Sequence, residues 1–410
     1  MSEKKNCSEA EKGRTQFRTL FLVACAAMLL SLVFSVPANV PEADADAAWY
    51  NASWQYRRKF TLIAGGPTAV ATTTTVGAAN FPTLISLSNT DLTGKMNDGC
   101  TDIVFTQSDG TTKLNHEVDS CVKSSGEFNA WVNTAMSSTT NTDIYMYYGG
   151  YGNQQNATST WEEQYDGVWH MSQDPSITTD GPCRGPTFNV CDSTTNRNHA
   201  TSTGAMTATD QINALVGGGI DFDGTDDKLG VTDRVGLDLL DPGGRKTISF
   251  FIKDSSVSTD QAILTKTNQI NLTGSSYGIR WDDGTTGKIE GYLDNDGTTS
   301  NGTLNDGAWH QFVHRLDVVA NSQVSFVDGA IQIDTAGANP AGSGNVNEIV
   351  SFGSDSDGSS FSSSLLDEIR IENIARDAMD IQTMYQNISA TTTFYTVGAE
   401  EGRRTKVRLR

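Results

Sequence analysis

The chain consists largely of short segments in which apolar and polar residues alternate, separated by turns rich in Gly, Asn and Asp. An apolar residue at every second position is the pattern of a strand with one buried face. Many short strands of this kind predict an all-β chain, built from sandwiches or barrels. The clearest alternating segments are residues 57–63, 143–148, 247–252, 309–316, 324–327 and 368–371.

Helical periodicity is nearly absent, and its best case is residues 375–388. There the apolar residues fall on one helical face, namely Ala378, Ile381, Met384, Tyr385 and Ile388. We therefore expect two β-sandwich domains, over residues 49–155 and 163–390, with a short helix near the end of the second. A final strand and a basic tail follow over residues 391–410.

The first 48 residues have the pattern of an export signal. Basic residues precede an apolar run over residues 20–36, and the small-residue pattern Ala45-Asp46-Ala47 follows. These features are typical of a secretory signal peptide, which we expect to span residues 1–48. An uncleaved signal anchor is the alternative, because the run approaches the ~17–25 residues of a membrane-spanning helix. We expect a secreted or cell-surface protein, in contact with a membrane only through this segment if it is uncleaved.

The number of cysteines and the net charge indicate which compartment and which partners suit this protein. Removal of the signal leaves four cysteines, for which three pairings are possible, and sequence proximity favours Cys100–Cys121 and Cys183–Cys191. The formal net charge of −20 argues against nucleic acid as a partner. The basic tail, residues 403–410, departs from this charge, and we expect it to be disordered rather than a docking segment.

Two stretches resemble known families. Residues 49–60, 102–105, 130–132 and 144–149 occur in an order that resembles the domain of unknown function 2341, a β-rich module of exported microbial proteins. This resemblance covers roughly residues 49–152. It implies an architecture but no mechanism, since that family has no assigned chemistry.

The second stretch, roughly residues 165–387, resembles the laminin-G-like jelly roll of the concanavalin A-like lectin/glucanase superfamily. Five motifs carry this resemblance, each weak alone: residues 168–171, 219–227, 306–313, 327–329 and 366–378. Their order predicts a concanavalin A-like jelly roll in the second domain. It does not predict a ligand, because one fold serves many functions.

The resemblance also implies a structural calcium ion. Hard cations take several carboxylate and carbonyl oxygens, and the turn containing Asp223, Gly224 and Asp226 offers them. In this superfamily Asp367 begins the last strand near the N-terminal turn, so we expect it to share the site with Asp226. The alternative is that Asp and Gly occupy this turn for backbone reasons alone.

Hydrolytic chemistry is not expected. Glycosidases of this superfamily place acidic residues at alternate positions of one strand, as Glu-x-Asp-x-Glu, so that two carboxylates act as a pair. The nearest match has Arg370 between Glu368 and Glu372. A guanidinium cannot act as acid, base or nucleophile at neutral pH, so we predict that Arg370 forms ion pairs with its neighbours. His310 and His314 share a strand face without a visible third ligand, and we expect both to be structural.

Aromatic residues are the remaining candidates for sugar contact, because rings stack on sugar faces. Trp281 and Tyr292 flank Asp-rich turns and are the candidates for an exposed platform. The sequence thus predicts a non-enzymatic binding or adhesion protein whose partner is an extracellular glycan or a surface protein. The alternatives are a structural component of a cell envelope or extracellular assembly, and an accessory domain of a polysaccharide-active system.

Overall fold

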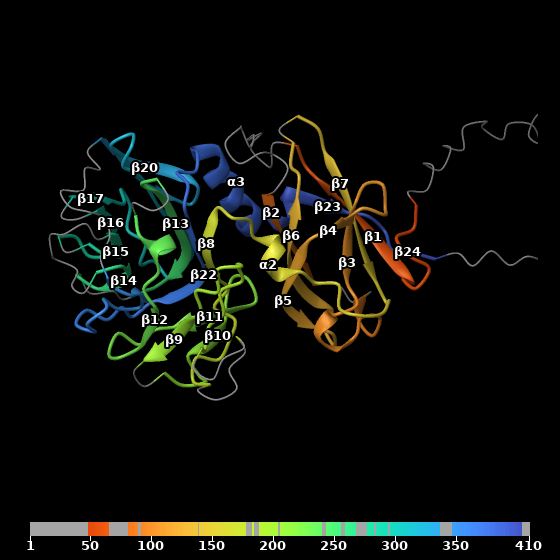
Figure 1. Ribbon diagram of the computed structural model, residues 1–410, viewed down its shortest axis with the longest axis horizontal. Helices are drawn as coiled ribbons and strands as arrows, with labels where there is room; N and C mark the ends of the chain where they lie inside the picture. The colour runs from red at the N-terminus through yellow and green to blue at the C-terminus, as the bar shows by residue number, and fades with distance from the viewer. Residues whose placement is uncertain are drawn as a thin grey trace, which may run out of the picture. The chain divides into compact units, whose positions relative to one another are not determined.

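Antiparallel pairing joins all the strands whose partners the structure describes (Figure 1). The computed structural model describes residues 48–403 except residues 65–80, 89–91, 138, 178–182, 184–187, 204–205, 240–242, 256–258, 268–276, 283, 294–295 and 337–346. The predicted signal peptide before Ala48 and the tail after Arg403 lie outside the described residues.

The first sandwich packs a six-stranded sheet against a three-stranded sheet. The six-stranded sheet has the order β23-β1-β7-β3-β4, with β24 also paired to β1, and the other has the order β2-β6-β5. The strands of the larger sheet are β1 (Tyr56–Leu62), β3 (Val104–Gln107), β4 (Lys113–Leu114), β7 (Thr142–Tyr148), β23 (Tyr395–Val397) and β24 (Glu401–Gly402). Those of the smaller sheet are β2 (Phe81–Ser88), β5 (His116–Val122) and β6 (Glu127–Thr134). One apolar core joins them, with Phe60 and Ile144 from the first sheet and Ile85 and Phe128 from the second.

The second sandwich is the jelly roll. Its eight-stranded sheet has the order β10-β11-β22-β13-β18-β19-β20, with β8 paired to β22. These strands are β8 (Tyr165–Trp169), β10 (Gln211–Asn213), β11 (Gly218–Asp221), β13 (Arg245–Lys253), β18 (Trp309–Asp317), β19 (Ser322–Val327), β20 (Ala330–Ala336) and β22 (Leu365–Glu372). The facing seven-stranded sheet runs β17-β16-β15-β14-β21-β12-β9. Its strands are β9 (Ala200–Thr203), β12 (Lys228–Val231), β14 (Ala262–Thr265), β15 (Tyr277–Trp281), β16 (Ile289–Leu293), β17 (Asp296–Thr299) and β21 (Val350–Phe352).

These strands confirm the predicted all-β fold with a C-terminal jelly roll. Every one of the six alternating segments coincides with a strand. Alternation places Ile369 and Ile371 of β22 in the core of the jelly roll. Arg370, which lies between them, and Glu372, which follows Ile371, face the other way and are nonetheless buried.

A third apolar cluster explains that burial, because it lies between the two sandwiches. It joins Leu84 and Trp131 of the first sandwich to residues of the second, namely Trp161, Tyr165, Val168, Val216, Phe251 and Ile388. The described residues from Trp49 to Arg403 form one compact unit. The domain boundaries at residues 155 and 163 therefore stay a prediction, as does the independent folding of the two domains.

The few helices are short. They are α2 (Ala157–Thr160), α3 (Ala378–Ser389), α4 (Thr391–Phe394) and the 3₁₀ turns η3 (Asp98–Cys100) and η4 (Val235–Leu237). Helix α3 confirms the predicted helix but begins three residues later than expected. Asp377 is its N-cap, because its side chain accepts a hydrogen bond from the main-chain nitrogen of Asp380 (2.8 Å).

After α3 the chain returns to the first sandwich. Strand β23 pairs with β1 (Phe60 opposite Val397), and β24 continues this pairing (Tyr56 opposite Gly402). In Figure 1 the blue C-terminal strand β23 accordingly lies beside the first-sandwich strands. The sequence predicts a final strand in this region, but its pattern does not identify a partner more than 300 residues earlier.

Both predicted disulfides are present. Cys100 pairs with Cys121 across a Cα–Cα distance of 6.2 Å, and Cys183 pairs with Cys191 across 5.1 Å. The first bond ties η3 to β5 within the first sandwich. Structural disulfides of this kind are typical of proteins that fold in an oxidising compartment.

Candidate functional site

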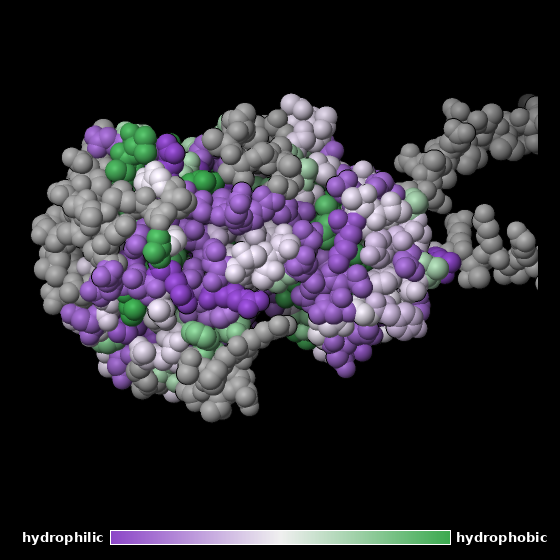
Figure 2. Space-filling view, in the orientation of Figure 1, coloured by the Kyte–Doolittle hydropathy of each residue, from purple (hydrophilic) through white to green (hydrophobic). Residues whose placement is uncertain are grey.

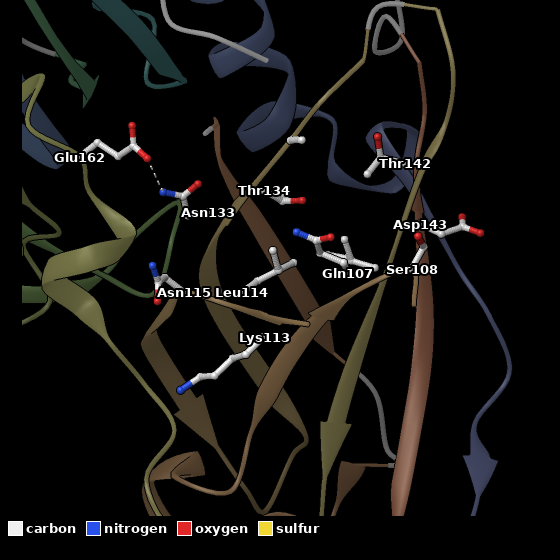
Figure 3. A pocket seen from close by; sticks show the side chains of 12 residues that line it. Gln107, Ser108, Lys113, Leu114, Asn115, Asn133, Thr134, Thr142, Asp143 and Glu162 are labelled. Atoms are coloured by element: carbon white, nitrogen blue, oxygen red, sulfur yellow. Dashed lines mark hydrogen bonds between the residues drawn. The ribbon is translucent and has the colours of Figure 1, made fainter. Parts of the chain in front are cut away.

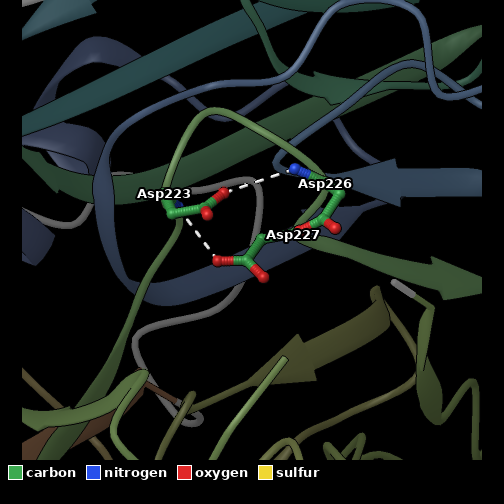
Figure 4. A group of neighbouring side chains, drawn as sticks. All are labelled: Asp223, Asp226 and Asp227. Carbon is green, nitrogen blue, oxygen red and sulfur yellow. Dashed lines mark hydrogen bonds between the residues drawn. The ribbon is translucent and has the colours of Figure 1, made fainter. Parts of the chain in front are cut away.

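An acidic turn between β11 and β12 is the candidate cation site (Figure 4). Asp223, Asp226 and Asp227 each place a carboxylate oxygen within 4.8 Å of the others. The Asp223 Oδ1 atom accepts from the main-chain nitrogen of Thr225 (2.7 Å), and Asp227 Oδ2 accepts from that of Asp223 (3.0 Å). Gly224 has a φ of +74°, and a Cβ there would lie 2.8 Å from Ser363 Cβ. The turn therefore requires glycine both for its conformation and for its close packing.

The charges of this turn repel one another. Burial raises the pKa of Asp227 to about 6, and the neighbouring charges of Asp223, Asp210 and Asp226 add to that rise. Asp223 and Asp226 are exposed, whereas Asp227 is buried. Asp223 and Asp227 each have a carboxylate oxygen outside the turn's own hydrogen bonds, and Asp226 has two. These oxygens form the hard donor set that calcium prefers. The residues present thus fit a divalent cation.

Asp367 is not a member of this group. Its Oδ2 atom accepts from the main-chain nitrogen of Val216 (2.8 Å), and its side chain is fully buried. The register explains the separation, because Ile220 lies opposite Leu366, which puts Asp367 level with Gly219. The residue that contacts the turn is Ser363. Asp367 lies four positions further along the chain, which corresponds to about 13 Å in an extended strand. Asp227, which directly follows the predicted Asp226, is the third carboxylate instead.

The expectation of an exposed platform at Trp281 and Tyr292 is wrong. The side chain of Trp281 is 0% exposed, lies in the jelly-roll core and donates from Nε1 to Ser364 Oγ (2.9 Å). Tyr292 is 3% exposed, and its ring lies so close to Gly278 that a Cβ there would be 2.3 Å from the hydroxyl oxygen. Neither ring is available to stack on a sugar, so ligand binding by these residues stays a prediction without structural support.

The surface agrees with this placement. Figure 2 shows a largely hydrophilic face, on which hydrophobic side chains of the described residues form only small separate groups. Among the large hydrophobic side chains that are exposed in the described part of the chain, Tyr151 is the aromatic one, and it belongs to the first sandwich. Among the described jelly-roll residues, aromatic side chains such as Trp309 and Phe361 are half-buried rather than exposed.

The carboxylates of β22 are buried and engaged. Glu368 Oε1 lies 2.7 Å from His170 Nδ1, and Glu368 Oε2 accepts from Arg370 Nη2 (2.9 Å). Glu372 Oε2 accepts from Arg376 Nε (2.6 Å). These contacts confirm the prediction that Arg370 forms an ion pair with its neighbour. His170 is a partner that the sequence did not reveal, because β8 and β22 are about 200 residues apart.

The predicted histidine face divides into two environments. His310 Nδ1 lies 2.8 Å from Asp328 Oδ2, and Nε2 lies 3.2 Å from Asp306 Oδ1. His314, four residues further along the same strand, is fully buried, and neither of its ring nitrogens has a hydrogen-bond partner. These two histidines and their neighbours do not form a metal-ligand group within the described residues.

Comparison with known proteins agrees with the fold. Residues 223–382, which lie in the jelly roll, match the family described as the concanavalin A-like lectin/glucanases superfamily. This match does not reach the first sandwich, so the resemblance of residues 49–152 to the domain of unknown function 2341 stays a prediction. No curated protein matches the chain.

Solved structures similar to the chain include a domain of a sugar-active enzyme and two toxin domains. Domain 4 of AbnA, an extracellular arabinanase from Geobacillus stearothermophilus in complex with arabinotriose, is 15% identical, with a TM-score of 0.40, over 54% of this chain and 98% of that one. The binding domain of paraclostridial mosquitocidal protein 1 is 12% identical (TM-score 0.38; 53% and 52% covered). The ligand binding domain of botulinum neurotoxin serotype D, in complex with N-acetylneuraminic acid, is also 12% identical (TM-score 0.39; 56% and 52% covered). The chain thus spans about half the length of both toxin domains.

Proposed function

We propose that this protein is a non-hydrolytic carbohydrate-binding protein that acts outside the cell. The family match of the jelly roll supports a lectin-like role. The two disulfides support an oxidising compartment. Among the described residues, no helix has the length and apolar character needed to cross a membrane.

The burial and ion pairing of the carboxylates on β22 support the proposal that the protein does not hydrolyse glycans. A retaining or inverting glycosidase needs two carboxyl groups that reach the sugar. Glu368 and Glu372 are 2% and 0% exposed, and each is already ion-paired within the protein. The middle position of the triplet is Arg370. This strand therefore has no carboxylate to offer to a substrate.

A glycan array of the exported protein tests this function, together with an assay for new reducing ends. We expect binding to at least one glycan class and no release of reducing ends after prolonged incubation. Release of reducing ends by the purified protein would overturn the non-hydrolytic part of the proposal. No binding to any glycan, with regular filaments in electron micrographs, would favour a structural component of an envelope instead.

We further propose that the acidic turn holds calcium. Asp223, Asp226 and Asp227 would supply carboxylate oxygens to the ion. The ion would relieve the repulsion among the three carboxylates and would hold the turn against Ser363. Its contribution would be the rigidity of this loop, and no chemical step depends on it.

Addition of 1–5 mM calcium is expected to raise the melting temperature, since a ligand that binds only the folded state stabilises it. The double variant Asp223→Asn with Asp226→Asn should lose this response. Asp109→Asn is the matched control, because Asp109 occupies a similar exposed turn, where it accepts from the main chain of Thr111 (2.8 Å). Differential scanning fluorimetry with calcium and with chelator makes the measurement. An identical calcium response in wild type and double variant would show that the ion binds at another site. No response in the wild type would show that the protein binds no calcium.

A further inference from the structure

A pocket of about 490 Å³ with a mixed polar and apolar lining lies at one end of the first sandwich (Figure 3). We call it the amide pocket, because three carboxamide side chains line it: Gln107, Asn115 and Asn133. They come from the end of β3, the residue after β4, and β6, so three separate strands converge on one space. Nothing in the sequence pattern singled out this group.

The amide of Asn133 is fixed in orientation. Its side chain is 8% exposed, and its Nδ2 atom donates to the Thr160 carbonyl oxygen (3.2 Å) and to Glu162 Oε1 (3.4 Å). In Figure 3 the amide nitrogen faces Glu162, and the amide oxygen is turned away from it. The Asn133 Oδ1 atom is therefore a positioned acceptor.

Asn115 complements this acceptor. The Asn115 Oδ1 atom accepts from Asn156 Nδ2 (3.4 Å). The NH₂ group of Asn115 therefore remains a donor. A hydroxyl group both donates and accepts, so paired amide donors and acceptors suit neighbouring hydroxyls. The exposed Gln107 amide adds a further group of the same kind.

The charges around the amide pocket nearly cancel. Asp143 is committed to the protein, with Thr61 Oγ1 donating to it (2.6 Å) and Lys59 Nζ 3.3 Å from its carboxylate. Lys113 and Glu162 remain, one of each sign. Leu114, which is 8% exposed, adds a small apolar surface that suits the C–H face of a sugar ring. This balance disfavours a strongly charged ligand.

We infer that the amide pocket binds a short, neutral glycan segment. Its volume lies within the roughly 300–1,000 Å³ typical of small-ligand sites, and its amides match neighbouring hydroxyl groups. The inference rests on the proposed carbohydrate-binding function and assigns that function a site in the first sandwich.

The test is calorimetric titration of the full exported chain with cellotriose, maltotriose and mannotriose, and with glucosamine and galacturonate trimers as charged probes. For the neutral trimer that binds, Gln107→Ala and Asn115→Ala should each weaken binding about five- to tenfold, the effect of one lost hydrogen bond. Ala135→Trp, at an exposed position of the same pocket, should block it and cost more than tenfold. Asn347→Ala, which removes an exposed amide of the jelly roll, should change affinity less than twofold.

The outcomes separate the two proposals. Unchanged binding in all pocket variants, with melting temperatures equal to wild type, would overturn the site and leave the proposed function standing. Tighter binding of a charged trimer than of every neutral one would overturn the ligand class. A wild-type chain that binds no carbohydrate on the array would overturn the proposed function itself.

Discussion

Replacement of Arg370 by Ala is expected to lower the free energy of unfolding by about 3–5 kcal/mol, the cost of removing one charged partner from a buried ion pair. Glu368, which Arg370 holds at 2.9 Å, is fully enclosed in the protein. Burial alone would raise the pKa of Glu368, but the charges of His170 and then Arg370 lower it. Without Arg370 the carboxylate keeps only His170.

Arg370 also contributes packing. Its guanidinium carbon lies 4.2 Å from the ring centroid of Trp131 and 4.9 Å from that of Trp161. Trp131 belongs to β6 of the first sandwich, so the guanidinium is wedged between the two sandwiches. Cation–π contacts that are desolvated in this way contribute about 2 kcal/mol. Loss of Arg370 therefore weakens the attachment of the first sandwich to the jelly roll.

Arg245→Ala is the matched control. Arg245 lies on β13, in the same sheet as Arg370, and pairs with Asp317 at 3.0 Å, but its side chain is 44% exposed. An exposed pair contributes about 0–1 kcal/mol, so this variant should unfold at nearly the wild-type urea concentration. Urea unfolding followed by tryptophan fluorescence compares the three proteins. Equal stability of Arg370→Ala and Arg245→Ala would show that the buried network does not hold the sandwiches together.

The all-β class, the jelly roll and the positions of its strands could be predicted because each depends on a local pattern. What covers a strand is not local. Alternation in β22 separates Ile369 and Ile371 from Arg370 and Glu372, which is the pattern of a sheet with one face in water. The structure buries the charged face beneath the first sandwich, and the partners that neutralise it lie far away in the sequence.

The same limit explains the outcome for the candidate site. The acidic turn was visible because its carboxylates are consecutive or nearly so. The position of Asp367 depends on the register between β11 and β22, which no single strand encodes. The turns beside Trp281 and Tyr292 predict exposure, but Trp281 is buried in the core between the two sheets and Tyr292 lies against the neighbouring strand β15. The amide pocket forms where three strands meet, and no sequence motif predicts it.

The free energy of unfolding is expected to fall on acidification through His314, and His314→Phe should reduce that fall by about 2–3 kcal/mol at pH 4.5. Burial lowers the pKa of His314 to about 3, and burial also lowers that of His116 to about 4. The unfolded chain binds a proton near pH 6.5, whereas the folded chain does not. Stability is therefore lost as the pH falls from about 6.5 toward 3.

Phe is the suitable replacement because the site fits a flat ring. A Cβ at Gly291 would lie 2.3 Å from His314 Nδ1, so the ring rests directly on the backbone of β16. The comparison must be between variant and wild type at each pH, since other groups act in the opposite sense. Burial raises the pKa of Asp119 and of Asp380 to about 7, which adds stability as the pH falls from 7 toward 3.8.

His310 provides the control on the same strand, because its pKa is raised, first by its hydrogen bond to Asp328. Its stabilising effect is complete below pH 6.5 and is lost as the pH rises through the folded-state pKa. His310→Gln should therefore cost stability at pH 4.5 and little at pH 8, opposite to His314→Phe. Urea unfolding at pH 8, 7 and 4.5 measures both variants. Parallel pH profiles for wild type and His314→Phe would mean that the folded protein protonates His314 as readily as the unfolded chain does.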